Sequence, residues 1–203
     1  MKDNSQFISK FIPFNTITFV SYLVIVTLLT FLIISNVSVS YQIGSAQAQV
    51  TNTSSASDLT DKGISLADLG KYEEAIEWYD KALEIDSKYL HALIYKGLAL
   101  KNLDKFEESI AWYDKALAIQ PKDVSALTNK GSALYGLGNY EEAIGYYDKA
   151  LEVDPKDLEP IFNKGLALYR LGEKGEAIVW IDKALTIDPT NEQILDWKSR
   201  IQE

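Results

Sequence analysis

Apolar residues recur at helical spacing along residues 56–191, in pairs of segments joined by short polar turns. Within residues 124–157 the large apolar positions are Leu127, Leu134, Leu137, Tyr140, Ile144, Tyr147 and Leu151. This is the i, i+3, i+4, i+7 pattern of helices that bury one side. Gly138-Asn139 interrupts the pattern midway and is typical of a turn between two helices. The pattern therefore predicts a helix–turn–helix unit.

The same unit occurs four times with a period of 34 residues and no insertion. The phrase YEEAIGYYDKALEVDPK, which begins at Tyr140, has counterparts that begin at Tyr72, Phe106 and Lys174. Aligning the units on a shared glycine at the eighth position gives the boundaries 56–89, 90–123, 124–157 and 158–191. Because one such unit cannot bury its apolar side alone, the four units are expected to stack into an array. Residues 192–203 are expected to form a helix that caps the last unit.

Small and aromatic residues fall at fixed positions of every unit. In the third unit they are Gly131, Ala143, Tyr147, Ala150 and Pro155, at positions 8, 20, 24, 27 and 32. Each unit thereby resembles a tetratricopeptide repeat. The resemblance covers residues 56–191 and implies an all-α fold, a right-handed α-solenoid of four tandem helix–turn–helix repeats. Departures from the repeat pattern are Ser87, Ser109 and Ile181.

Two details of the array are predicted from single residues. Pro155 is expected to end the second helix of the third unit, with Asp154 capping the helix that follows. Lys174 stands where the other units have an aromatic residue, so the inter-helix turn of the last unit is expected to be looser.

The N-terminal region is predicted to cross or enter a membrane. Residues 17–34 are almost continuously apolar and uncharged, long enough to span a bilayer. Lys2 and Lys10 precede this run, which favours a cytoplasmic N-terminus and exported repeats. The expected division is a cytoplasmic segment at 1–16, a transmembrane helix or signal-peptide core at 17–39, and a flexible polar tether at 40–55.

Two outcomes remain open for this region. The protein is either a single-pass membrane protein with its repeats on the extracytoplasmic side, or is secreted after cleavage following Ala48, at the end of an A-x-A site. Asn36 and Asn52 lie in N-glycosylation acceptor patterns, of which Asn52 is the better candidate.

Charge and composition narrow the function classes. The formal net charge is −9, and residues 1–55 hold only Lys2, Lys10 and Asp3 of the charged residues, so residues 56–203 carry 18 basic and 28 acidic residues. Such an acidic domain is repelled by nucleic acid. With no cysteine and a single histidine, His91, no metal site or cofactor is expected. Paired glutamates such as Glu141/Glu142 suit a helix N-terminus. We find no catalytic constellation and expect no enzyme.

The resemblance implies that positions 2, 5, 6, 9, 12 and 13 of the units line a concave groove. The candidate partner-binding residues at these positions are Tyr95, Lys101, Asn129, Tyr135, Phe162, Asn163, Tyr169 and Arg170. Asparagine amides suit an extended peptide backbone, and tyrosines supply apolar area with a polar tip. The alternative is that the apolar members only pack between repeats. The carboxylate clamp of chaperone-binding relatives is absent, since its positions hold Thr60, Ile64, Tyr95, Ser125 and Asn129.

The sequence thus favours a non-catalytic scaffold that binds a protein or peptide in the groove, with a self-assembling structural module as the alternative. Two features of the second helices are interpreted as structural. Trp78, Trp112 and Trp180 share one position and are expected to pack between units, with a second binding strip as the alternative. Recurring pairs such as Asp148-Lys149 are expected to form a solvated surface.

Overall fold

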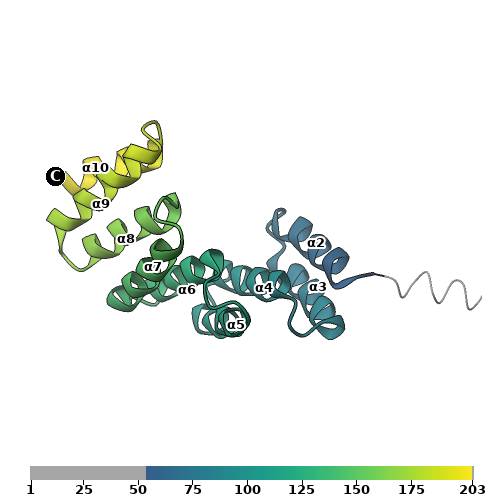
Figure 1. Cartoon of the computed structure of the whole chain (residues 1–203). Helices are drawn as coiled ribbons and strands as arrows, with labels where there is room; N and C mark the ends of the chain where they lie inside the picture. The colour runs from purple at the N-terminus through teal and green to yellow at the C-terminus, as the bar shows by residue number, and fades with distance from the viewer. Residues whose placement is uncertain (1–53, 203) are drawn as a thin grey trace, which may run out of the picture. The chain divides into compact units, whose positions relative to one another are not determined.

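The computed structural model describes residues 54–202, which form one compact unit of nine helices without a strand (Figure 1). The helices are α2 (Ala56–Ala67), α3 (Tyr72–Ile85), α4 (Leu90–Asn102), α5 (Phe106–Ile119), α6 (Val124–Gly136), α7 (Tyr140–Val153), α8 (Leu158–Arg170), α9 (Lys174–Ile187) and α10 (Glu192–Gln202). Each of the four units contributes one helix pair, and α10 packs on α9. The predicted all-α array of helix pairs is confirmed.

Several predictions fall outside the described residues. The cytoplasmic segment at 1–16, the transmembrane or signal segment at 17–39, the cleavage site after Ala48 and both glycosylation patterns all lie there. Of the tether at 40–55, only Ser54 and Ser55 are described, and Ser55 caps α2. Across residues 54–202 no helix combines the length and apolar character needed to cross a membrane.

Local sequence sets where the first helices begin. Ser55 and Asp58 form a capping box at α2, in which each side chain accepts a hydrogen bond from the other's backbone N–H. Asp157 caps α8 by accepting from the backbone N–H of Glu159. The prediction that Asp154 caps this helix is wrong, because its side chain accepts from Lys156 inside the connecting turn.

The inter-helix turns share one geometry. In the third unit Gly138 has a φ of 83° and Asn139 N–H donates to the Leu134 carbonyl, and in the fourth unit Gly172 has a φ of 85° and Glu173 N–H donates to Leu168. These bonds close the helix end in the manner of a Schellman motif. The prediction of a looser last turn is therefore wrong: glycine in the left-handed region sets the turn, and Lys174 only follows it.

Within each unit the two helices cross closely at the shared glycine. A methyl group added at Gly131 would lie 2.6 Å from the ring of Tyr147, and the added group would meet Tyr79 at Gly63 and Tyr113 at Gly97 in the same way. All three rings are buried. The repeated glycine thus makes room for the repeated tyrosine, which explains a residue that is otherwise unfavourable within a helix.

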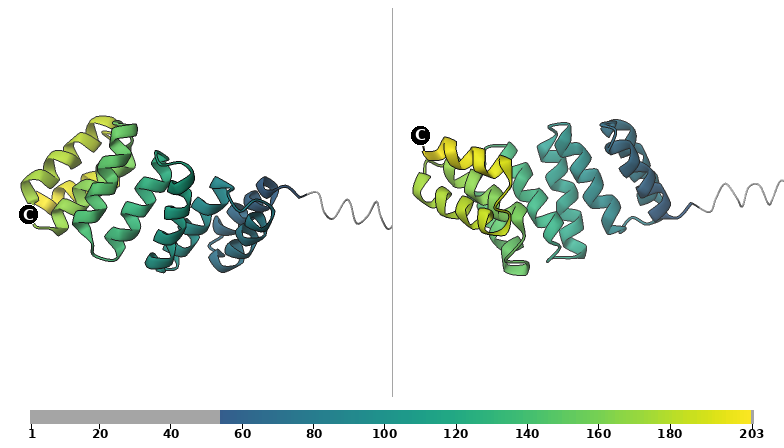
Figure 2. Two further views of the ribbon diagram at one scale, coloured as in Figure 1. Left: turned by 60° about the horizontal axis from the view of Figure 1, so that its bottom comes forward. Right: turned by 90° about the horizontal axis from the view of Figure 1, so that it is seen from above.

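Successive units stack so that two surfaces form. The first helices contact one another directly, α2 with α4, α4 with α6, and α6 with α8, and we call their shared surface the first-helix face (Figure 2). On the other side, a lysine of each later first helix, and of α10, pairs with an aspartate of the preceding second helix. These pairs, which we call the Lys–Asp ladder, are Lys96–Asp80, Lys130–Asp114, Lys164–Asp148 and Lys198–Asp182.

The Lys–Asp ladder is coupled to the repeated tryptophans. Lys96 and Lys115 hold their ammonium groups 3.9 and 3.4 Å from the ring centroid of Trp112, and Trp78 and Trp180 are flanked by lysines in the same way. Cation–π contact of this kind is favourable. The adjacent Asp–Lys pairs such as Asp148-Lys149 are largely exposed, as predicted, and their aspartates in addition form ion pairs with a lysine of the next unit or of α10.

Candidate partner-binding groove

The first-helix face brings several predicted residues into direct contact. On its central part, Lys101 of α4 donates from Nζ to Oδ1 of Asn129 on α6 over 2.7 Å. The Asn129 amide in turn donates to the Ser125 carbonyl at 3.0 Å. Burial lowers the pKa of Lys101, and the negative charge of Glu159 on α8 partly opposes this shift. Lys101 and Asn129 therefore form one polar connection between the second and third units.

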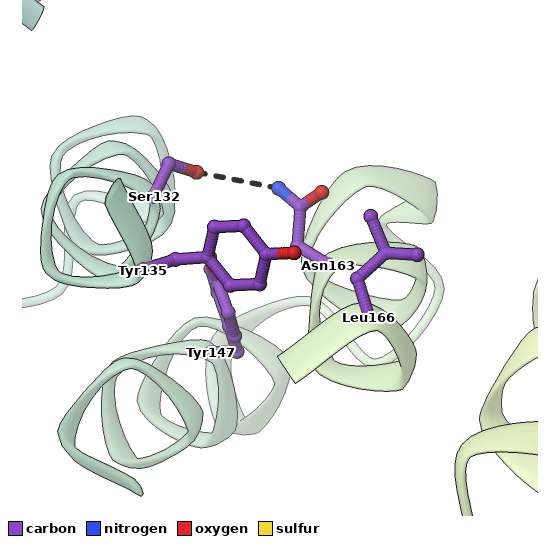
Figure 3. A pocket seen from close by; sticks show the side chains of 5 residues that line it. All are labelled: Ser132, Tyr135, Tyr147, Asn163 and Leu166. Atoms are coloured by element: carbon purple, nitrogen blue, oxygen red, sulfur yellow. Dashed lines mark hydrogen bonds between the residues drawn. The ribbon is translucent and has the colours of Figure 1, made fainter. Parts of the chain in front are cut away.

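A small cavity lies between the third and fourth units (Figure 3). It has a volume of about 90 Å³ and is lined by Ser132, Tyr135, Tyr147, Asn163 and Leu166. Asn163 Nδ2 reaches from α8 to donate to Ser132 Oγ on α6 over 3.3 Å, as the dashed line in Figure 3 shows. The lining residues combine two tyrosine rings and a leucine with the Ser132 hydroxyl and the Asn163 amide.

An arginine and a tyrosine form a further polar contact between the third and fourth units. Arg170 Nε donates to the Tyr135 hydroxyl over 2.9 Å, which is the main reason that the pKa of Arg170 is raised. Tyr169, next to it, packs edge-on against Trp197 of α10 with ring centroids 6.0 Å apart. Arg170 is thus exposed at the edge of the groove, while part of the Tyr169 ring is used to dock α10.

Two predicted residues lie apart from this cluster. Phe162 is only 8% exposed and belongs to the core that α8, α9 and α10 share, so it packs the array and offers almost no surface to a partner. Tyr95 stacks on Tyr79 at 6.2 Å between ring centroids and lines a separate cavity near α2. The structure therefore brings together Lys101 with Asn129, and Tyr135 with Asn163 and Arg170.

Ser132 and Tyr147 were not among the predicted site residues. Ser132 occupies position nine, where the other units have Ile64, Leu98 and Leu166, so the single polar residue in an apolar register was an available signal. Tyr147 repeats at the core position of Tyr79 and Tyr113, and nothing in the sequence distinguishes it. Its contact with the cavity depends on how the fourth unit stacks on the third.

The chemistry of the groove is that of a binding surface. Among the described residues the Asn163 amide oxygen accepts no hydrogen bond, and Asn129 and Tyr135 add further polar groups on the same face. In residues 54–202 no group of three or more histidine, aspartate or glutamate side chains converges to hold a metal ion. The arrangement suits hydrogen bonding to a peptide backbone, with an apolar cavity for one side chain.

Comparison with protein families matches all or part of each of the four units. The family described as tetratricopeptide repeat matches residues 56–89, 124–157 and 159–191, and the TPR repeat description matches residues 97–138. The chain belongs to the tetratricopeptide repeat family. Tetratricopeptide (TPR) repeats are protein interaction modules, and no enzymatic family is indicated.

Solved structures share the fold. YrrB, a TPR protein with an unusual peptide-binding site, is 24% identical, with a TM-score of 0.61 over 77% of this chain and 80% of its own. MamA from Desulfovibrio magneticus is 24% identical, with a TM-score of 0.61 over 68% and 77%. The first TPR domain of Spaghetti (RPAP3), bound to the HSP90 peptide SRMEEVD, is 27% identical, with a TM-score of 0.56 over 58% and 93%. Comparison with curated proteins gives no match.

Proposed function

We propose that this protein is a non-catalytic scaffold that holds an extended segment of a partner protein in the concave groove of its first-helix face. The observation that carries the proposal is a set of three separate polar contacts between successive first helices, beside a small cavity. They are Lys101–Asn129 between α4 and α6, and Asn163–Ser132 and Arg170–Tyr135 between α8 and α6. Amides spaced along such a face match the regular donors and acceptors of an extended chain.

Family membership supports peptide binding without naming the peptide. The related TPR domain of Spaghetti binds an acidic HSP90 peptide. In this chain the groove instead presents Glu159, and its charge reaches Lys101, Tyr113 and Tyr147. An acidic tail would be repelled there, so the proposed partner segment is neutral or basic.

We also propose that the array works on the extracytoplasmic side of a membrane, anchored by residues 17–39 or released after Ala48. The uncharged apolar run and the two preceding lysines support this placement. Protease added to intact cells would degrade the repeats if this placement is right. Repeats protected in intact cells and degraded only after lysis would contradict it.

Binding in the groove is tested by selecting peptides from a random library on the full chain. The test variant carries Asn129→Ala and Asn163→Ala, and the control carries Asn139→Ala, an exposed asparagine whose side chain makes no capping bond. We expect peptides that bind the natural chain and the control, and that lose about tenfold or more in affinity with the double variant, since two hydrogen bonds are removed. Equal binding to all three proteins, or no selected peptide, would overturn the proposal.

A further inference from the structure

A second and larger cavity lies on the first-helix face between the first two units. It has a volume of about 280 Å³, and the residues that line it include Ala67, Asp68, Tyr72, Tyr79 and Tyr95. Tyr79 and Tyr95 stack with their ring planes 24° apart, and Asn102 adds an amide. The cavity is therefore lined by three aromatic rings and one carboxylate, and such groups together favour binding of an organic cation.

The cavity exists because the first unit lacks a side chain that the later units have. Position 12 holds Ala67 in the first unit and Lys101, Tyr135 and Tyr169 in the others. Between the second and third units, the Lys101 side chain reaches from α4 to Asn129, the position-six residue of α6. Tyr95 is the position-six residue of α4 and lines the open cavity. At the boundary between the second and third units, position 12 thus supplies a lysine, Lys101. At the boundary between the first and second units, the same position holds only Ala67.

Charge at the cavity favours a cation. Asp68 is exposed and forms no ion pair with any other described residue. Burial raises the pKa of Tyr79, and the neighbouring Tyr95 and the negative charge of Asp68 raise it further. The negative charge of Asp68 therefore acts on Tyr79, whose ring lines the cavity. The buried Tyr79 hydroxyl has no hydrogen-bond partner among the described residues, and a buried polar group without a partner favours a ligand that supplies one.

We propose that this cavity binds a lysine side chain of the partner segment, with its aliphatic stem against Tyr72 and Tyr95 and its ammonium group toward Asp68. The inference rests on the proposed function in that the lysine belongs to the segment bound in the groove. It adds a specificity rule: the segment carries a lysine where it passes the first two units. The net negative charge of the domain supports attraction of such a segment.

The test uses the full chain with labelled tyrosine rings and two matched small probes, Nα-acetyl-lysine methylamide and its neutral norleucine analogue. We expect saturable NMR shifts of the Tyr72 and Tyr95 rings with the lysine probe, and about fivefold weaker binding after Asp68→Asn, as for loss of an exposed counter-charge. Ala67→Lys should abolish binding by filling the cavity from within, while Ala118→Lys, at an exposed alanine of α5, should not. Circular dichroism verifies that each variant stays helical.

Two results would overturn the inference: no shift of these rings at saturating lysine probe, or equal shifts with the norleucine probe. Variants at Asn129 and Asn163 should leave probe binding unchanged, so failure of this site is distinguished from failure of the groove. Norleucine replacement of lysines in a groove-selected peptide supplies the second arm. Unchanged affinity after every replacement would leave groove binding intact and refute the lysine site.

Discussion

The two sides of the array differ in how faithfully they repeat. Along the Lys–Asp ladder, position 7 is lysine and position 25 is aspartate in all four units, and position 23 is always tryptophan or tyrosine. On the first-helix face, position 12 changes from Ala67 to Lys101 to tyrosine, and position 13 holds four different residues. The repeated side makes the contacts that every pair of units needs. The first-helix face does not have to make the same contacts in every unit, so its residues can vary. Both cavities described above lie on this face.

The largest expected effect is alkaline unfolding through the repeated tyrosines. Burial raises the pKa of Tyr79, Tyr113 and Tyr147 above the ordinary value of 10.0. The unfolded chain therefore loses these protons first, and stability that is complete below pH 10 falls by about 1.4 kcal/mol per pH unit per tyrosine above it. Unfolding midpoints measured by circular dichroism in urea, at pH 8 to 12, check this.

Two lysines act on the same alkaline titration in opposite directions. Burial alone lowers the pKa of Lys130, but its bonds to Asp114 and Tyr146 outweigh this and the pKa is raised, so its contribution is also lost at high pH. The lowered pKa of Lys101 has the opposite sign and adds stability as pH rises. A chain equally stable at pH 8 and pH 12 would contradict the raised pKa of the buried tyrosines.

The next effect comes from the glycine–tyrosine crossing. Gly131→Val places side-chain atoms where an added Cβ already lies 2.6 Å from the Tyr147 ring, and should cost about 3 kcal/mol through overpacking. Gly145→Ala is the matched control, because an added Cβ at this helical position meets nothing within 4 Å. It should stabilise α7 by up to about 1 kcal/mol. Thermal unfolding of both variants separates helix propensity from close packing, and equal midpoints would contradict the crossing as described.

The smallest expected effect is on stability, from a substitution in the Lys–Asp ladder, and it distinguishes the role of the ladder from that of the first-helix face. Asp114→Asn leaves the buried Lys130 without its charged partner and should cost about 1 kcal/mol, since Asp114 itself is half exposed. Affinity for a groove-selected peptide should stay unchanged, because the Lys–Asp ladder lies outside the groove. Urea unfolding and peptide titration on the same variant check both halves. A loss of peptide affinity without a loss of stability would reverse the roles assigned to the two sides.

The sequence predicted which helix face a candidate residue lies on where its register alone decides this, and partner binding by these residues stays a prediction. Positions 6 and 12 put Lys101, Asn129 and Asn163 on one face, and each forms a hydrogen bond to a neighbouring unit in the structure. Sequence reasoning failed for Phe162, which has a groove register but is only 8% exposed. Register gives the direction of a side chain from its helix, and exposure depends on the neighbouring helices that cover it.

The sequence by itself determined the period, the helix pairs, the glycine turns and the residues on each face, because these depend on spacing along one chain. Only the tertiary structure decided which side chains meet across units. Lys130 reaches Asp114 and Lys101 reaches Asn129 through the stacking of separate helices, and the cavity beside Ala67 is open because Ala67 cannot reach Tyr95 as Lys101 reaches Asn129. Such contacts depend on the rotation and translation between units, which no local pattern encodes.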